Sequence, residues 1–139
     1  PPDLKYMHAA TYSGHAACCA VGLANLAIIE REGLVERAAS VGSWFQALLT
    51  RQLESLPAVG QVRGLGMMAA VELVDRAQRG PALYDGALGL ATRVVERCVE
   101  RGQIPRRVNN TICLAPPLIS TEDQLNRLVD VLGEAIRAA

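Results

Sequence analysis

The chain has 139 residues, of which 50% are hydrophobic and 20% are charged, and this length and composition are typical of one globular domain with its own core. Its 14 basic and 14 acidic residues balance, so no charge excess attracts a polyanion and no nucleic acid partner is expected. No stretch approaches the roughly 20 apolar residues that a membrane span requires, so no membrane partner is expected either.

The first predicted helix follows Ser13, a candidate N-cap, and ends before Gly33, a glycine suited to the position after a helix. Four residues recur at helical spacing: Ala17, Val21, Ala24 and Ile28. Because small and apolar residues occur on several faces, we predict a buried spine helix.

A second helix is predicted from residue 34 to about residue 56, where Pro57 stops it. The glycine-rich residues 59–66 and the strand-like residues 67–74 follow. Alternation along the second of these segments places four side chains on one face: Met67, Ala69, Val71 and Leu73.

The segment from Asp75 to Pro81 is expected to be a surface loop, and a third helix is predicted from about Tyr84 to Arg101, with Gly102 as its stop. Its predicted apolar side is Leu88, Ala91, Val95, Cys98 and Val99.

Short strands are predicted around Ile104 and over residues 111–114, with a turn at residues 108–110 between them. Residues 120–123 open the last predicted helix with a side-chain cap and an acidic first turn. Its predicted core stripe is Leu125, Leu128, Val129, Leu132 and Ile136. The order of elements predicts an α+β fold in which helices cover a small sheet.

The four cysteines have neither paired-ligand nor redox-motif spacing, so no metal site is expected. They are Cys18, Cys19, Cys98 and Cys113. Cysteine commonly fills small apolar core positions, so we predict buried, reduced thiols and a cytoplasmic setting. The chain begins with Pro1 instead of methionine, and we expect it to be a fragment of a longer protein.

Residues 8–15, HAATYSGH, contain six residues that are glycine or carry a hydrogen-bonding tip, directly before a predicted helix. Hydroxyl groups and unpaired amide N–H groups at a helix start can bind an anion. An N-cap with flanking turn residues is the plainer interpretation of this segment.

These residues, followed by the small-residue helix that contains GLANL at 22–26, resemble the segment after the cofactor lysine in class III (omega-type) aminotransferases. Three later motifs agree in order and spacing: VRGLGMMAAVEL at 62–73, IPR at 104–106 and APPLI at 115–119. Together they cover nearly the whole chain, which makes the resemblance more specific than any single motif.

The resemblance implies the C-terminal portion of a fold-type I enzyme that depends on pyridoxal 5'-phosphate (PLP), α/β overall in the parent. Residues 1–32 would be the tail of the large PLP-binding domain and a connecting spine helix, and residues 33–139 the small domain with an antiparallel sheet. The parent would be a homodimer with shared active sites. It would transfer an amino group between an amine or amino acid and a keto acid or aldehyde.

By the same resemblance, Thr11 would bind the cofactor phosphate of the neighbouring subunit, and Arg106 would bind a substrate carboxylate. A guanidinium group offers a carboxylate two parallel hydrogen bonds. Arg107 is the nearest rival, but alternation along a strand points the two arginines to opposite faces, so only one can serve. Arg63 could contact an anion, although an ion pair that anchors its hairpin is the plainer interpretation.

The neighbours of Thr11 receive structural roles at this stage. Tyr12 and Ser13 would shape the loop and cap the helix, and His8 and His15 are expected to be structural more often than proton-transferring.

The chain departs from the family pattern in two ways. Ala16 replaces the usual proline, but alanine also suits a first helical turn. The family's cofactor lysine, its aspartate and its ring-stacking aromatic all lie upstream of Thr11. Lys5, the only lysine here, is too close to Thr11 to be that lysine. We therefore assign no catalytic residue and expect the chain alone to be inactive.

Two alternatives stay open at this stage. A PLP-dependent aminomutase or decarboxylase-like enzyme of the same fold would share the scaffold and differ in its substrate pocket. A non-catalytic α+β binding or regulatory module would use the turn at residues 11–14 as an anion site or only for assembly.

Overall fold

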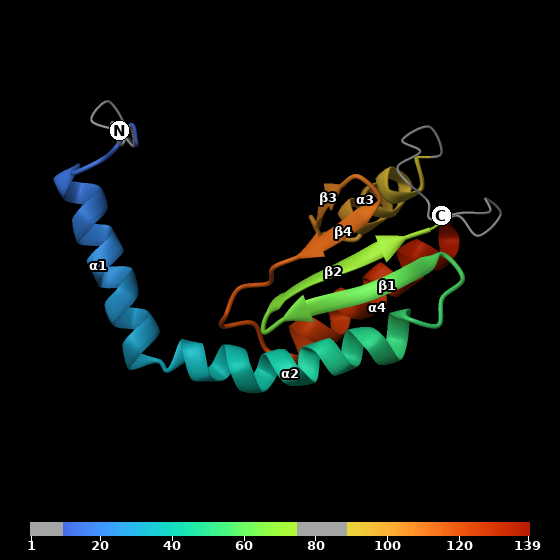
Figure 1. Ribbon diagram of the computed structural model, residues 1–139, viewed down its shortest axis with the longest axis horizontal. Coiled ribbons are helices and arrows are strands. Elements are labelled where there is room, and N and C mark those ends of the chain that lie inside the picture. Colours follow the sequence, from blue (N-terminus) through green and yellow to red (C-terminus); the bar gives the residue numbers. More distant parts are fainter. Residues whose placement is uncertain (1–9, 75–88) are drawn as a thin grey trace, which may run out of the picture. The chain divides into compact units, whose positions relative to one another are not determined.

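A computed structural model of the chain describes residues 10–74 and 89–139 (Figure 1). The chain divides into two compact units, Pro1–Val35 and Glu36–Ala139. The first unit contains helix α1 (Ala16–Arg31), and the second contains a four-stranded antiparallel sheet with helices packed against it. The α+β fold class predicted from the sequence is confirmed.

Helix α1 begins after His15, whose Nδ1 atom accepts a hydrogen bond from the Cys18 amide at 3.5 Å. The prediction of Ser13 as the N-cap is wrong, because Gly14 turns the chain at φ +71° and helical geometry starts only after His15. The predicted C-terminal end is confirmed. Gly33 donates its amide N–H to the Glu30 carbonyl. Its φ of +58° is a left-handed backbone angle that glycine adopts at little cost, because it has no Cβ atom.

The predicted burial of α1 is wrong for this chain, since none of its residues is buried. Cys18 and Cys19 are exposed, whereas Cys98 is buried and Cys113 half-buried. The reason is geometric: among residues 10–35, the described part of the first unit, α1 is the only helix that lies wholly within the unit, and one helix cannot bury its own side chains. All four cysteines are free thiols, and the cytoplasmic setting stays a prediction.

Helix α2 (Leu34–Leu53) ends three residues before the predicted position. Proline disfavours helical geometry in the residue before it, so the chain leaves the helix ahead of Pro57 through a tight turn in which the Leu56 amide donates to the Leu53 carbonyl. The side chains that α2 buries in the core are Phe45, Leu48, Leu49 and Leu53.

The sheet has the strand order β1-β2-β4-β3. Its strands are β1 (Val59–Leu65), β2 (Met68–Leu73), β3 (Arg106–Val108) and β4 (Thr111–Leu114). The predicted β1–β2 hairpin is confirmed, and so is the shared buried face of Met67, Ala69, Val71 and Leu73. The strand predicted around Ile104 lies two residues later, because Pro105 has no N–H for a ladder hydrogen bond.

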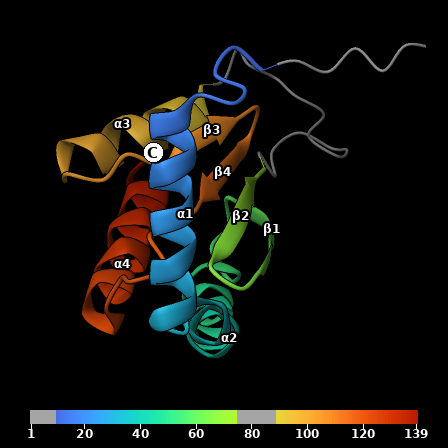
Figure 2. The same cartoon turned by 90° about the vertical axis from the view of Figure 1, so that its left-hand side faces the viewer.

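Helices α3 (Leu90–Glu100) and α4 (Glu122–Ala138) lie on the same face of the sheet (Figure 2). In α4 the Thr121 hydroxyl accepts from the Gln124 amide and the Gln124 side chain accepts from the Thr121 amide, so the predicted cap is confirmed as a capping box. Four of the five predicted stripe residues of α4 are buried: Leu125, Val129, Leu132 and Ile136. The fifth, Leu128, is partly buried against the core.

The core side of α3 differs from the prediction at positions 94 and 99, and the predicted Leu88 lies outside the described residues. Val94 is buried, whereas Val99 is 48% exposed, because the described helix turns positions 91, 94 and 98 toward the core. Burial raises the pKa of the Cys98 thiol, although the nearby Arg101 charge opposes this, so Cys98 is an inert core residue. Gly102 ends the helix at φ +79°, as predicted. The predicted start near Tyr84 and the predicted loop from Asp75 to Pro81 lie outside the described residues.

Helix α2 holds the turn of the β1–β2 hairpin. Gln46 Nε2 donates to the carbonyl oxygens of Gly66, at 2.9 Å, and Met68, at 3.0 Å. Gly42 lies so close to this turn that a Cβ atom there would be 2.5 Å from the Gly66 backbone. The contact therefore requires glycine at position 42.

We expect Gly42→Ala to lower the free energy of unfolding by about 1–3 kcal/mol, since the helix and the hairpin turn must separate to admit the methyl group. Urea denaturation measures the effect. Gly22→Ala is the matched control, because the same methyl group within α1 would meet nothing within 4 Å. Equal stability of the two variants would contradict the close-contact explanation.

Candidate functional site

Thr11 lies in an exposed turn before α1, in the first unit. The turn is closed by hydrogen bonds from the Ser13 amide to the Ala10 carbonyl, at 2.9 Å, and from the His15 amide to the Tyr12 carbonyl, at 3.1 Å. Within the described part of the chain, neither the Thr11 hydroxyl nor the Thr11, Tyr12 and Gly14 amides form a hydrogen bond. The turn thus holds several donors that have no partner in the described part of the chain.

This donor set suits a phosphate group. A hydroxyl group and free amide N–H groups donate to phosphate oxygens, and the positive end of the α1 dipole lies just after them. Tyr12 and His15 pack edge to face with ring centroids 5.9 Å apart, and His15 also caps α1. Both side chains therefore stabilise the turn. His8 lies outside the described residues.

Arg106 lies on the edge strand β3 in the second unit, with Cys113 of β4 as its register partner. The next pair is Arg107 with Ile112, and the Ile112 side chain is buried on the helix-covered face. Cross-strand partners share a face, so Arg107 belongs to the helix-covered face and Arg106 to the opposite one. The predicted opposite orientation of the two arginines is confirmed.

A row of four residues crosses the sheet on the face of Arg106. The register places Arg63, Ala70, Cys113 and Arg106 opposite one another on the four strands. Arg63 Nη1 donates to Glu72 Oε2 at 2.8 Å, so this arginine is the hairpin anchor that the plainer interpretation predicted. Arg106 forms no ion pair or hydrogen bond with any described residue. No carboxylate in residues 10–74 and 89–139 therefore competes with an anion for this guanidinium group.

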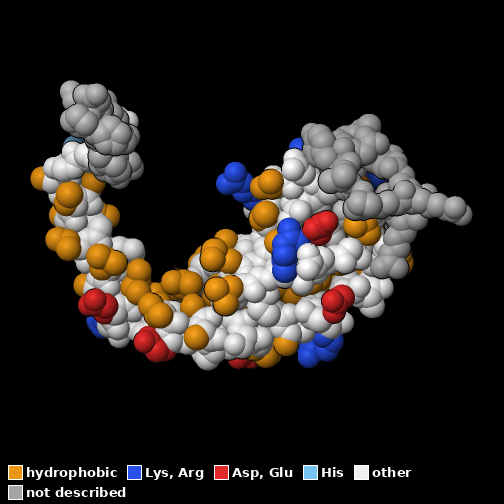
Figure 3. All heavy atoms as spheres, viewed as in Figure 1, with side chains coloured by type: hydrophobic (Ala, Val, Ile, Leu, Met, Phe, Trp, Pro, Cys, Tyr) orange, Lys and Arg blue, Asp and Glu red, His pale blue; other side chains and the backbone are white. Residues whose placement is uncertain are grey.

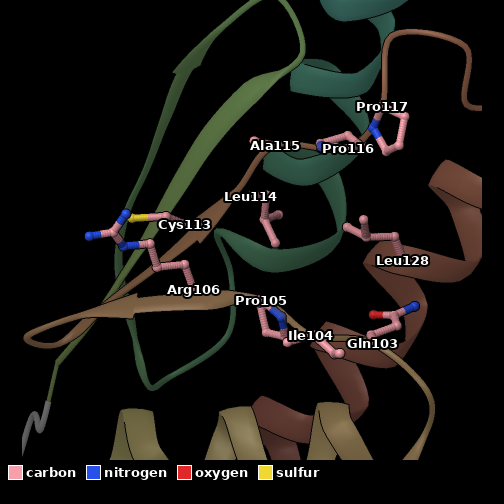
Figure 4. Close-up of a pocket in the computed structure, with 10 residues that line it drawn as sticks. All are labelled: Gln103, Ile104, Pro105, Arg106, Cys113, Leu114, Ala115, Pro116, Pro117 and Leu128. Atoms are coloured by element: carbon pink, nitrogen blue, oxygen red, sulfur yellow. The ribbon is translucent and has the colours of Figure 1, made fainter. Parts of the chain in front are cut away.

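A cavity of about 400 Å³ lies next to Arg106 (Figure 4). Its wall is mainly apolar and includes Leu114, Pro116 and Leu128. In Figure 4 the guanidinium group of Arg106 lies beside Cys113, and both side chains point away from Leu128. The guanidinium group thus lies at the margin of the hollow, where its two parallel N–H donors suit a carboxylate.

Arg37 is a structural residue that the sequence did not reveal. Its half-buried side chain reaches from α2 to the loop between β4 and α4, where Nε donates to the Leu118 carbonyl at 2.9 Å and Nη2 donates to the Ser120 carbonyl. Ser120 itself is buried, with 7% of its surface exposed. These contacts join residues more than 80 positions apart, so no local spacing could have indicated them.

Residues 10–74 and 89–139 contain neither a candidate membrane span nor a candidate metal site. No helix there is long and apolar enough to span a bilayer. In the same residues, no three His, Cys, Asp or Glu side chains are grouped so that they could share a metal ion.

Comparison with known proteins gives a consistent result. The profile of the family described as aminotransferase class-III matches residues 2–136. Diaminobutyrate–2-oxoglutarate transaminase of Halomonas elongata is 44% identical over 125 residues, which are 88% of this chain and 26% of the relative.

Two solved structures are similar over nearly all of the chain. Adenosylmethionine-8-amino-7-oxononanoate aminotransferase of Methanocaldococcus jannaschii has a TM-score of 0.84 and 38% identity, with 97% of this chain and 30% of that one covered. A PLP-bound amine transaminase of an uncultivated Pseudomonas species has a TM-score of 0.82 and 39% identity, with 96% and 30% covered. The chain thus spans less than a third of the length of these proteins.

Proposed function

The chain belongs to the class III aminotransferase family, and from that premise we propose that it is part of a PLP-dependent enzyme that transfers an amino group from an amine or amino acid to a keto acid or aldehyde. The observation that carries the proposal is the Arg106 guanidinium group, which has no ion-pair or hydrogen-bond partner among the described residues and borders an apolar cavity. The donors of the Thr11 turn, for which residues 10–74 and 89–139 supply no partner, support it independently.

In this proposal Arg106 binds the carboxylate of the keto-acid acceptor and fixes its orientation. The guanidinium group keeps its charge at any physiological pH, and its planar fork matches the two carboxylate oxygens. Arg107 cannot replace it, because it lies on the opposite face and donates to the Asn109 carbonyl at 3.1 Å. An amine that has no carboxylate would not use this contact.

Thr11 holds the cofactor phosphate in the same proposal, through its hydroxyl and the neighbouring amide N–H groups. When bound, PLP supplies the electron sink that amino transfer requires. We propose that the lysine that binds PLP comes from polypeptide outside these 139 residues, because Lys5, the only lysine, is too close to Thr11. The chain alone is then inactive, and Thr11 serves the neighbouring subunit of a homodimer.

The proposed domain division follows from these roles. Residues 1–32 would complete the large domain and supply Thr11, and residues 33–139 would form the small domain and supply Arg106.

The proposal is tested by coexpressing the chain with the part of the Halomonas elongata transaminase that it does not match. We expect added PLP to change its visible absorbance as it binds to the lysine of that part, and amino transfer to a keto acid to follow. Neither change should occur with the chain alone. If the assembled pair binds PLP but transfers no amino group, the transaminase assignment is wrong.

We expect Thr11→Ala to raise the dissociation constant of PLP by roughly ten- to a hundredfold, because a hydrogen bond to a charged phosphate is worth about 1.5–3 kcal/mol. The measurement is cofactor retention during dialysis of the assembled enzyme. Thr11→Ser keeps the hydroxyl and should retain PLP, and Ser13→Ala changes a neighbouring hydroxyl as a control. Equal cofactor loss from the Thr11→Ala and Ser13→Ala variants would remove the role of Thr11.

A further inference from the structure

The side of the sheet opposite α3 and α4, which we call the open face, carries Arg63, Glu72, Cys113 and Arg106. Among the strand residues that alternation places on this face, Glu72 is the only carboxylate. Figure 3 shows acidic and basic side chains meeting over the strands. A single carboxylate thus shares a face with the arginine that we propose for the substrate.

Glu72 lies close to the position of Arg106 on this face. Its register partner on β4 is Thr111, two residues before Cys113, and the Arg106 guanidinium group lies beside Cys113 (Figure 4). Diagonal neighbours on paired strands are roughly 7–8 Å apart, which long side chains can span. A glutamate at position 72 could therefore pair with Arg106 if no other residue held it.

The Arg63 guanidinium group holds Glu72. Its Nη1 atom donates to Glu72 Oε2 at 2.8 Å and to Gln61 Oε1 at 3.2 Å. Gln61 and Glu72 are register partners, so both contacts draw the Arg63 side chain toward their row of the sheet and away from the row of Arg106. The charge of Glu72 is thus balanced within its own row.

We propose that Arg63 is a positioning residue for acceptor binding: it pairs with Glu72 and so keeps this carboxylate from occupying Arg106. This inference rests on the proposed function, in which Arg106 binds the acceptor. The side chains of Arg63 and Glu72 are 46% and 42% exposed, and an exposed ion pair adds little to stability. The pair therefore matters more for acceptor binding than for folding.

The first experiment measures acceptor kinetics in the chain coexpressed with the unmatched part of the Halomonas elongata transaminase. Arg63→Ala should raise KM for pyruvate by roughly fivefold, the effect of one unit charge about 4 Å away in water. The variant should leave kcat, and KM for an uncharged aldehyde, nearly unchanged. Glu72→Gln in the Arg63→Ala background should restore KM for pyruvate, because it removes the competing carboxylate.

Arg101→Ala is the matched control. It breaks another exposed ion pair, in which Arg101 Nε lies 3.6 Å from Glu134 Oε2, on the helix side of the sheet. Its KM for pyruvate should equal that of the wild type. Arg63→Lys keeps a cation beside Glu72 and should retain most of the pyruvate affinity.

An unchanged KM for pyruvate in Arg63→Ala would overturn the inference. A raised KM that Glu72→Gln does not restore would overturn it as well, because Arg63 would then contact the acceptor itself. Equal losses with pyruvate and the aldehyde would assign Arg63 to the fold of the hairpin and also refute the positioning role.

Alkylation of Cys113 in the chain alone reads the same charges without amino transfer. Cys113 is a free, half-buried thiol beside Arg106, which should favour the anion iodoacetate over neutral iodoacetamide. Arg63→Ala should lower the ratio of the two rates by roughly fivefold, and Glu72→Gln should restore it. Mass spectrometry of peptides separates Cys113 from the exposed Cys18, whose ratio should stay constant. A constant ratio at Cys113 contradicts the inference.

The two proposals fail in distinguishable ways. If the assembled enzyme transfers no amino group but the rate ratio at Cys113 responds to both substitutions, the proposed function is refuted and the control of Arg106 by Arg63 stands. If Arg106→Ala impairs transfer to pyruvate and Arg63→Ala does not, only the role of Arg63 is refuted.

Discussion

We expect replacement of Arg106 with alanine to lower kcat/KM for keto-acid acceptors by roughly a hundredfold in the assembled enzyme and to leave amines without a carboxylate nearly unaffected, since each hydrogen bond to a charged group is worth about 1.5–3 kcal/mol. The effect is selective because Arg106 has no partner among the described residues, so its removal breaks no ion pair there. Steady-state kinetics with pyruvate as acceptor and with an uncharged aldehyde as acceptor separate the two cases.

Two control variants sharpen this test. Arg107→Ala removes a neighbouring guanidinium group from the opposite face and should leave both acceptors nearly unchanged. Arg106→Lys keeps the charge but loses the planar fork, and it should restore only part of the activity with the keto acid. Equal losses for the keto acid and the aldehyde in Arg106→Ala would show that the residue acts on the fold and not on the carboxylate.

Replacing Phe45 with alanine should lower the free energy of unfolding of the second unit by about 3–5 kcal/mol, because it removes a fully buried aromatic ring and leaves a cavity. Phe45 is packed in the cluster that also contains Leu49, Val71 and Val129, which come from α2, the sheet and α4. The cavity would therefore open where three elements meet. Urea denaturation followed by circular dichroism measures the loss.

Leu65→Ala is the control for this variant. Leu65 is 81% exposed at the end of β1, so its truncation should change the unfolding free energy by no more than about 0.5 kcal/mol. A similar loss in the Leu65 and Phe45 variants would mean that the hairpin end is covered in solution and that the core assignment needs revision.

Local signals predicted most of the elements of the second unit. The Thr121 cap, the Gly102 stop and the alternation along β2 each act within a few residues, and the structure confirms all three. Strand β4 was predicted over its observed range for the same reason, since Pro116 and Pro117 limit where it can end.

The errors have two physical sources. The N-cap of α1 shifted from Ser13 to His15 because the left-handed Gly14 between them delays the helix, and sequence spacing alone does not fix that backbone angle. The burial of α1 was overestimated because composition indicates that a helix needs covering but not which polypeptide covers it.

In the candidate site, the sequence predicted that Arg106 and Arg107 lie on opposite faces of their strand. It could not predict that Arg106 has no ion-pair partner among the described residues. Strand alternation separated Arg106 from Arg107 from the sequence alone. That Glu72 pairs with Arg63, while no described carboxylate pairs with Arg106, depends on a register set by four strands. The contact between Arg37 and the loop at residues 118–120 is equally nonlocal.

The short outer strand β3 has a further consequence for how this chain behaves at high concentration. An exposed strand edge can pair with the edge of another molecule and start aggregation. Strand β3 has only three residues, and two of them are arginines that place positive charge on both faces of the edge. Two copies brought edge to edge would repel each other, so the residue that we propose for a substrate carboxylate also helps to keep the sheet soluble.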